Sequence, residues 1–189
     1  MLNIVLFGAP GCGKGTQAQR IRERFNLNHI STGEVIRGEI ARQSPLGKQM
    51  KSYIEAGQLA PDELVINIIV DYLASHSDAQ GNIFDGFPRT TAQAEAFDRI
   101  LSERGEKVDK MIYMDVPEEE LVRRILLRGK DSGRADDASE EVIRNRIKVY
   151  NEQTAIVADH YSKQGKYSRI DGVGTMEEVT ERIAAAIEG

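Results

Sequence analysis

Short apolar runs alternate along this chain with longer segments in which apolar residues recur every three or four positions. The apolar runs have the length and composition of buried β-strands, and they cover residues 2–7, 29–31, 82–85, 110–116 and 167–170. The periodic segments predict amphipathic helices, the last of which begins at the capping-box match Thr175-Met176-Glu177-Glu178. Strands that alternate with helices predict an α/β fold, a parallel sheet with helices on both faces.

Two stretches break this alternation. Residues 31–60 are helical in pattern, with a split at Ser44-Pro45, where proline can start a new helix. The segment Gly129–Asp137 is polar, contains glycine and predicts a loop. We expect both stretches to be insertions in a single core domain of residues 1–189, and to carry function.

The helical periods also predict which side chains face the core. These include Leu64, Ile68 and Tyr72 after Pro61, Tyr150 in the long helix around residues 143–161, and Met176 with Val179 and Ile183 in the last helix.

The strongest motif follows the first predicted strand and opens the first predicted helix. It is Gly8-Ala9-Pro10-Gly11-Cys12-Gly13-Lys14-Gly15-Thr16, a P-loop in the sequence context that this motif requires. Its glycines let backbone N–H groups surround a phosphate, and Lys14 adds a positive charge. Position 15 is glycine and the hydroxyl comes one residue later, at Thr16, which questions a direct hydroxyl–magnesium bond. The motif predicts a nucleotide-phosphate site.

Cys12 is the only cysteine, so the chain has no internal disulfide and no multi-cysteine zinc site. Two interpretations of its side chain stay open. Lys14 and the helix N-terminus favour a thiolate with a pKa below about 8.5. A small buried apolar side chain in contact with the sheet is the other.

A second motif, Asp85-Gly86-Phe87-Pro88-Arg89, ends the predicted strand of residues 82–85. In a parallel sheet the carboxyl ends of the strands meet at the binding crevice, so this motif should lie beside the P-loop. Asp85 could hold magnesium there, directly or through water. Gly86 permits close approach of a ligand, and Pro88 stiffens the loop that directs Arg89. A plain turn capped by Asp85 is the alternative.

The basic residues near these motifs suit two bound nucleotides. Five phosphates carry about six negative charges, and the candidate cations are Lys14, Arg37, Arg89, Arg124, Arg128, Arg134 and Arg146. The three histidines, His29, His76 and His160, share no ligand spacing, so we expect ordinary surface or core roles for them. Transfer to an ionised phosphate oxygen needs no general base, because positioning and charge neutralisation suffice.

Composition excludes several classes of partner. A net charge of −5 disfavours general nucleic-acid binding and membrane-surface binding. No apolar run approaches the length of a membrane span, and the N-terminus lacks a targeting pattern. We therefore expect a cytoplasmic protein with no nucleic-acid or membrane partner.

These motifs occur in an order that resembles the adenylate kinase family over nearly the whole chain. The matching segments are Gly8–Thr16, Ser31–Glu34 with Arg37, Gly57–Pro61, Asp85–Arg89 with Gln93, and Arg128–Asp137. The resemblance implies a P-loop NTPase-type parallel sheet with a helical AMP-binding insertion at 31–60 and a short lid at 128–138. It also implies a monomer that catalyses ATP + AMP ⇌ 2 ADP with Mg²⁺, and without the structural zinc of long-lid forms.

The resemblance further implies roles for individual residues. ATP would contact Gly11, Cys12, Gly13, Lys14, Gly15, Thr16, Arg128 and Gly174. AMP would contact Thr32, Arg37, Gln58, Leu59, Ala60, Gly86, Phe87, Pro88, Arg89, Gln93, Arg134 and Arg146, with Ala60 standing where the family often has valine. The catalytic set would be Lys14, Asp85, Arg89, Arg124, Arg128, Arg134 and Arg146, with Asp85 reaching magnesium only through water.

Two other functions remain open at this stage. Kinases of the UMP/CMP type share the short lid and the Gly-Phe-Pro-Arg loop. Thr32 and Gln93 favour adenine in the family pattern, although Thr90-x-x-Gln93 also matches a helix capping box. A non-catalytic switch that binds ATP is the alternative from another class, and it would leave the arginine set unexplained.

Overall fold

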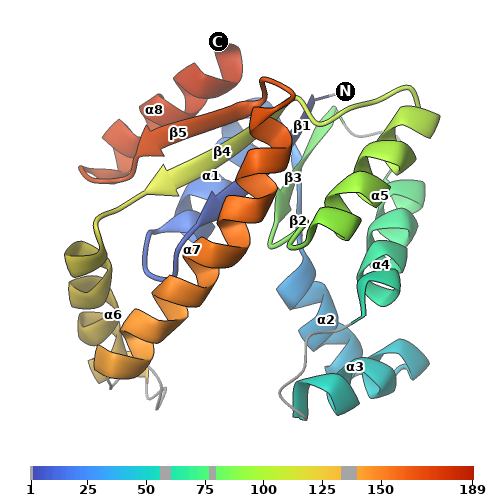
Figure 1. Ribbon diagram of the computed structural model, residues 1–189, viewed down its shortest axis with the longest axis horizontal. Coiled ribbons are helices and arrows are strands. Elements are labelled where there is room, and N and C mark those ends of the chain that lie inside the picture. The colour runs from blue at the N-terminus through green and yellow to red at the C-terminus, as the bar shows by residue number, and fades with distance from the viewer. Residues whose placement is uncertain (1, 56–60, 77–79, 133–139) are drawn as a thin grey trace.

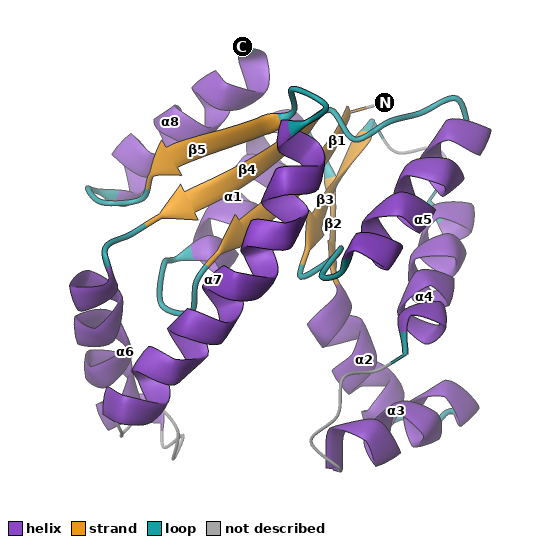
Figure 2. Ribbon diagram, in the orientation of Figure 1, coloured by secondary structure: helices purple, strands orange, loops and turns teal. Residues whose placement is uncertain are grey.

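The computed structural model describes residues 2–55, 61–76, 80–132 and 140–189, and it contains one five-stranded sheet (Figures 1 and 2). The strands are β1 (Leu2–Gly8), β2 (Asn28–Ser31), β3 (Gly81–Asp85), β4 (Lys110–Asp115) and β5 (Tyr167–Asp171). Their order is β2-β3-β1-β4-β5, and every neighbouring pair is parallel. The predicted strands and the parallel α/β class are confirmed.

Six helices cover the sheet or follow its strands: α1 (Lys14–Phe25), α4 (Asp62–Ser75), α5 (Thr91–Glu103), α6 (Glu118–Ser132), α7 (Glu140–Ser162) and α8 (Met176–Glu188). Figure 2 shows α1 and α8 on one face of the sheet and α4, α5 and α7 on the other. Among the described residues, no helix combines the length and apolar character needed to cross a membrane.

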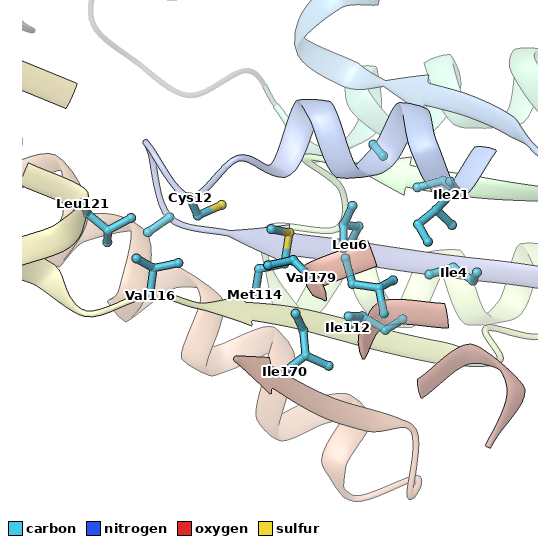
Figure 3. Close-up of a cluster of buried hydrophobic side chains, with 14 of the residues drawn as sticks. Ile4, Leu6, Cys12, Ile21, Ile112, Met114, Val116, Leu121, Ile170 and Val179 are labelled. Carbon is cyan, nitrogen blue, oxygen red and sulfur yellow. The ribbon is translucent and has the colours of Figure 1, made fainter. Parts of the chain in front are cut away.

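The central strand β1 explains why both faces are covered. Successive strand residues point to opposite faces, and from Ile4 to Phe7 both sets in β1 are apolar. Ile4 and Leu6 are buried with α1 and α8 in one cluster, part of which Figure 3 shows. Val5 and Phe7 are buried with α4 and α5 in another. A strand that is buried on both sides has a continuous apolar sequence, as Ile4–Phe7 has here.

The remaining helices, α2 (Thr32–Ala41) and α3 (Pro45–Glu55), follow β2 and extend beyond the carboxyl ends of the strands (Figure 1). The predicted split between them is confirmed. The Ser44 hydroxyl accepts a hydrogen bond of 2.9 Å from the Gly47 amide, which caps the first turn of α3. A Cβ on Gly47 would lie 2.0 Å from the Glu39 carbonyl oxygen, so the two helices can only pack this closely at glycine.

The end of α6 differs from the prediction. The sequence predicted a loop from Gly129, but the helix continues to Ser132. A glycine inside a helix costs only about 1 kcal/mol, and the leucine, arginine and lysine residues around it favour helix. The predicted lid segment beyond this point, residues 133–139, lies outside the described residues.

Two predicted core faces are also partly wrong. In α4 the buried residues include Val65 and Ile69, whereas Leu64 and Tyr72 are only half-buried, so the helix presents a neighbouring stripe to the core. Met176 is 62% exposed. It is the first residue of α8 and borders a cavity near Gly174 instead of packing in the core.

Candidate functional site

The loop between β1 and α1 is built around glycines in left-handed backbone conformations. Gly11 has φ +86° and Gly13 has φ +88°. A Cβ on Gly11 would also lie 2.7 Å from Cγ1 of Ile125. Gly13 caps α1 without any side-chain hydrogen bond, so the first N–H groups of the helix are not used by a capping side chain. Such a helix N-terminus is suited to bind a phosphate.

Lys14, at the start of α1, meets the carboxylate that ends β3. Its Nζ lies 2.7 Å from Oδ1 of Asp85, and Nε2 of His29 lies 3.4 Å from Oδ2 of the same residue. Burial raises the pKa of Asp85, but the His29 hydrogen bond and the Lys14 charge together hold it below its usual value. Burial opposes the charge on Lys14, yet Tyr150 and Asp85 raise the pKa of this ammonium overall. Both groups are therefore ionised.

The sequence predicts only a surface or core role for His29, but the structure places this histidine beside Asp85 of the site. His29 and Ser31 lie two positions apart in β2, and Ser31 pairs with Asp85 of β3 in the sheet register. Two residues of a strand that are two positions apart share a face. A histidine two residues before the end of a strand adjacent to Asp85 was the available signal.

Tyr150 was predicted as a core residue of α7, and it also borders the P-loop. Its hydroxyl accepts a hydrogen bond of 3.0 Å from the Gly8 amide. The Lys14 Nζ lies 5.9 Å from the centre of its ring. Burial raises the pKa of this phenol, so the hydroxyl is neutral near pH 7. Its position one helical turn after Arg146 was a signal that the apolar pattern hid.

A cleft of about 840 Å³ lies over the P-loop. It is lined by Gly8–Thr16, Arg89, Arg124, Arg128, Asn145, Arg146, Val149, Tyr150 and Gln153. The structure therefore brings together five of the seven predicted cations, from the helices α1, α6 and α7 and from the loop after β3. Arg37 does not line this cleft, and Arg134 lies outside the described residues.

Arg124 is held in this cleft by one contact within its own helix and one contact with the P-loop. Its Nε donates to Glu120 at 2.9 Å, one turn earlier in α6. Its Nη1 donates to the Cys12 carbonyl oxygen at 3.3 Å. The second contact ties α6 to the P-loop.

The loop after β3 turns at Gly86, which has φ +83°. Its carbonyl oxygen accepts hydrogen bonds from the Thr32 hydroxyl at 3.2 Å and from Nε of Arg89 at 2.8 Å. Phe87 and Pro88 are buried, with the Phe87 ring packed edge-on against Phe97, whereas Arg89 is exposed. The loop is thus anchored in the core and presents its arginine to the cleft.

Gln93 fulfils part of the capping prediction and adds a contact. Its backbone N–H donates to the Thr90 hydroxyl at 3.1 Å, and this hydrogen bond caps α5. Its side chain accepts from the Arg89 amide at 2.8 Å and donates to Asp62 at 2.8 Å. Asp62 was not predicted, and it joins the start of α4 to this loop.

The sequence also predicts Arg37 and residues 58–60 for the AMP site. Arg37 is exposed on α2, with its guanidinium over Gly33, where a Cβ would lie 3.2 Å from it. Gln58, Leu59 and Ala60 lie outside the described residues. A further cavity of about 250 Å³ also borders the P-loop and is lined by Gly13, Arg124, Gly172 and Gly174, among others.

The structure decides between the two interpretations of Cys12. Its side chain is 3% exposed and belongs to the apolar cluster of Figure 3. Burial raises the pKa of the thiol and outweighs the opposing charge of Lys14. A Cβ on Gly8 would lie 2.3 Å from its Sγ, so the thiol fills space beside the strand end. The reactive-thiolate interpretation is wrong, because the side chain is buried in the apolar cluster.

The chain matches the family model described as adenylate kinase over residues 6–166. The chain belongs to the adenylate kinase family. It is 56% identical over 188 residues to an adenylate kinase of Phocaeicola vulgatus. This match covers 100% of this chain and 99% of that protein. The adenylate kinases of Bacteroides fragilis and Stenotrophomonas maltophilia are 54% and 47% identical, also over 188 residues and 100% of this chain, and over 99% and 100% of those proteins. Family membership agrees with the sheet order and with the cleft of cations.

Proposed function

We propose that this chain transfers the γ-phosphoryl group of ATP to AMP and gives two molecules of ADP. Its family membership and its likeness to proteins named adenylate kinase support this function. The observation that carries it is the convergence of Lys14, Arg89, Arg124, Arg128 and Arg146 on one cleft over the P-loop. Five cations around one cleft suit the charge of two nucleotides better than that of one.

The ATP side of the proposal uses the loop and the first helix. The N–H groups of Gly11–Thr16 would bind the phosphates, with the Lys14 ammonium on the β- and γ-phosphates. Arg124 and Arg128 would neutralise charge that develops during transfer. The cavity beside Gly174 would take the adenine.

The AMP side uses α2 and the loop after β3. Thr32, Gly86–Arg89 and Gln93 are joined by hydrogen bonds, and Arg37 lies on the same helix as Thr32. We infer that the two arginines hold the AMP phosphate and that Gln93 contacts its base, with Leu59 and its neighbours Gln58 and Ala60 closing the site. The attacking phosphate oxygen is already ionised, so no general base is required.

We further infer two movable parts on the core of residues 1–189. Residues 31–60 would be the AMP-binding insertion and residues 128–138 a short lid, which would bring Arg134 to the phosphates beside Arg146. Exclusion of water by closure would favour transfer to AMP over hydrolysis of ATP. Since both nucleotide sites come from one chain, a monomer suffices.

Magnesium fits the site at Asp85, whose ionised carboxylate lies beside the P-loop ammonium. Among the described residues no three histidine, cysteine or acidic side chains cluster to hold a metal. We infer that Asp85 holds magnesium through water, with the nucleotide phosphates as the other ligands. When bound, the ion supplies neutralisation of phosphate charge.

A coupled assay with ATP and a panel of AMP, UMP, CMP and GMP tests the function. We expect AMP to be preferred in kcat/KM by at least about 100-fold, because a site built to hydrogen-bond one base rejects others strongly. Preference for UMP or CMP would establish the alternative kinase. ATP binding without turnover of any monophosphate would instead establish a switch.

A further inference from the structure

Tyr150 joins α7 to the first residue of the P-loop. Its hydroxyl accepts the Gly8 amide proton at 3.0 Å, across 142 positions of sequence. Gly8 pairs with Met114 of β4 on one side, but on the other side the last pair between β1 and β3 is Leu6 with Asp85, so Gly8 lies beyond the β3 ladder. A hydrogen bond from α7 therefore holds the strand end where the P-loop begins.

The ring of Tyr150 is also placed by its neighbours. It lies 6.5 Å from the Phe7 ring, and the Lys14 ammonium lies 5.9 Å from its centre. With Phe7, Gly86 and Arg89 it lines a narrow space between the end of β1 and the loop after β3. The one side chain thus contacts the ATP side of the cleft and borders the AMP side.

The helix that carries Tyr150 is fixed at several points and also bears Arg146. Ile143 and Ile147 are buried in one apolar cluster, and Val157 and Tyr161 are buried in the other. Arg146 lines the cleft one turn before Tyr150, since residues four apart share a helix face. A firmly packed helix therefore carries both a cleft arginine and the support of the P-loop.

We propose that Tyr150 is a positioning residue for phosphoryl transfer, whose hydroxyl and ring keep the P-loop and Lys14 in register with Arg146. This inference rests on the proposed function and adds to it the part that aligns the cations. Small displacements of aligned groups reduce transition-state stabilisation more than ground-state binding. The effect of Tyr150 should therefore appear in kcat.

Three variants isolate the contribution. Tyr150→Phe removes the hydroxyl and keeps the ring, and Tyr150→Leu removes both. Tyr113→Phe is the matched control, because its hydroxyl donates to Asn151 of the same helix at 3.1 Å and Tyr113 does not line the cleft. Each protein is assayed in the complete chain for kcat, for KM of ATP and AMP, and for Tm.

For Tyr150→Phe we expect kcat to fall about fivefold to tenfold with both KM values nearly unchanged, which matches the loss of one hydrogen bond. For Tyr150→Leu we expect a fall of about 100-fold, because the lysine loses its support as well. Tyr113→Phe should lower Tm no more than Tyr150→Phe does, because its hydrogen bond is exposed, and it should leave kcat unaltered.

A Tyr150→Phe enzyme with kcat equal to that of Tyr113→Phe would overturn the inference, and so would a rise in KM alone. If Tyr150→Leu fails to fold by circular dichroism, the phenylalanine variant decides by itself. A wild-type chain that forms no ADP from ATP and AMP would overturn the proposed function and this inference with it. An active wild type with an unaffected Tyr150→Phe would overturn this inference alone.

Discussion

The two halves of the cleft differ in how their cations are held. On the P-loop side, Lys14 pairs with Asp85, and Arg124 is tied to Glu120 and to the Cys12 carbonyl. On the side of α2 and the loop after β3, Arg37 is exposed and Arg89 donates to Gly86 of its own loop. The cations of the first half are tied to separate elements of the fold, whereas Arg89 in the second half makes a local contact.

This difference suggests how the work of binding is divided. Donors that are already oriented stabilise developing charge without further rearrangement. Exposed donors with few fixed contacts must be ordered when the ligand binds, and that cost reduces affinity. We therefore expect the P-loop side to be preformed and the other side to reorganise when AMP binds.

The largest effect should come from Arg89, which borders both halves. Arg89→Ala should lower kcat by about 10³–10⁵, as expected for an arginine that neutralises a transferring phosphoryl group. The fold should survive because the side chain is exposed. Arg99→Ala, an exposed arginine of α5, is the control and should keep full activity. Activity of Arg89→Ala within about tenfold of the parent, with normal circular dichroism, would remove Arg89 from the mechanism.

Arg37 separates the two halves most clearly. Arg37→Ala should raise the KM for AMP by about 10-fold to 100-fold, the value of a charge-assisted hydrogen bond, and leave the KM for ATP unchanged. The matched control is Arg42→Ala. Arg42 directly follows the last residue of α2 and pairs with Glu39. Equal effects on the two KM values would contradict the assignment of α2 to AMP.

The pH dependence of the stability tests the role of Asp85 on the P-loop side. Its pKa in the folded protein lies below the usual value, so its ionised form stabilises the fold at neutral pH, and this stabilisation is lost as the pH falls through the folded pKa. In urea titrations, wild type should lose more stability than Asp85→Asn between about pH 5 and pH 3. Asp159→Asn, at an exposed pair with Lys163, should follow wild type. Parallel curves for wild type and Asp85→Asn would show that the buried pair adds no pH dependence.

The smallest effect should come from Cys12. Cys12→Ala should cost about 1 kcal/mol of stability, as for other small losses of buried volume, and should leave activity in place. A thiol reagent should modify the native protein far more slowly than the urea-unfolded chain. Rapid native labelling that ATP prevents would restore the reactive thiol that the burial of this side chain rejects.

The fold was predictable because strand burial leaves a direct trace in sequence. Residues 4–7 are buried on alternate faces of the sheet, and both faces are covered, so these four positions are all apolar, although the buried Asn3 before them is polar. The end of α6 was not predictable from glycine alone, because one glycine costs little within a helix of strong formers.

The site was predictable where glycines and charges mark it. The P-loop and the motif from Asp85 to Arg89 were found from local residue types, and the structure places them side by side. Tyr150 and His29 were missed because their roles depend on contacts with distant segments. A tyrosine at an apolar position of a helix gives the same sequence pattern whether or not its hydroxyl bonds to the end of a strand.

The most direct test of the divided cleft is a crystal structure with a mimic that joins two adenosines through five phosphates, compared with the free protein. After superposition on the sheet, we predict that the P-loop and Tyr150 move by less than about 1 Å, as preformed sites do, while α2, α3 and the Arg89 side chain move further. One adenine should lie beside Gly174 and the other near Thr32. A rearranged P-loop with α2 and α3 in place would contradict the account.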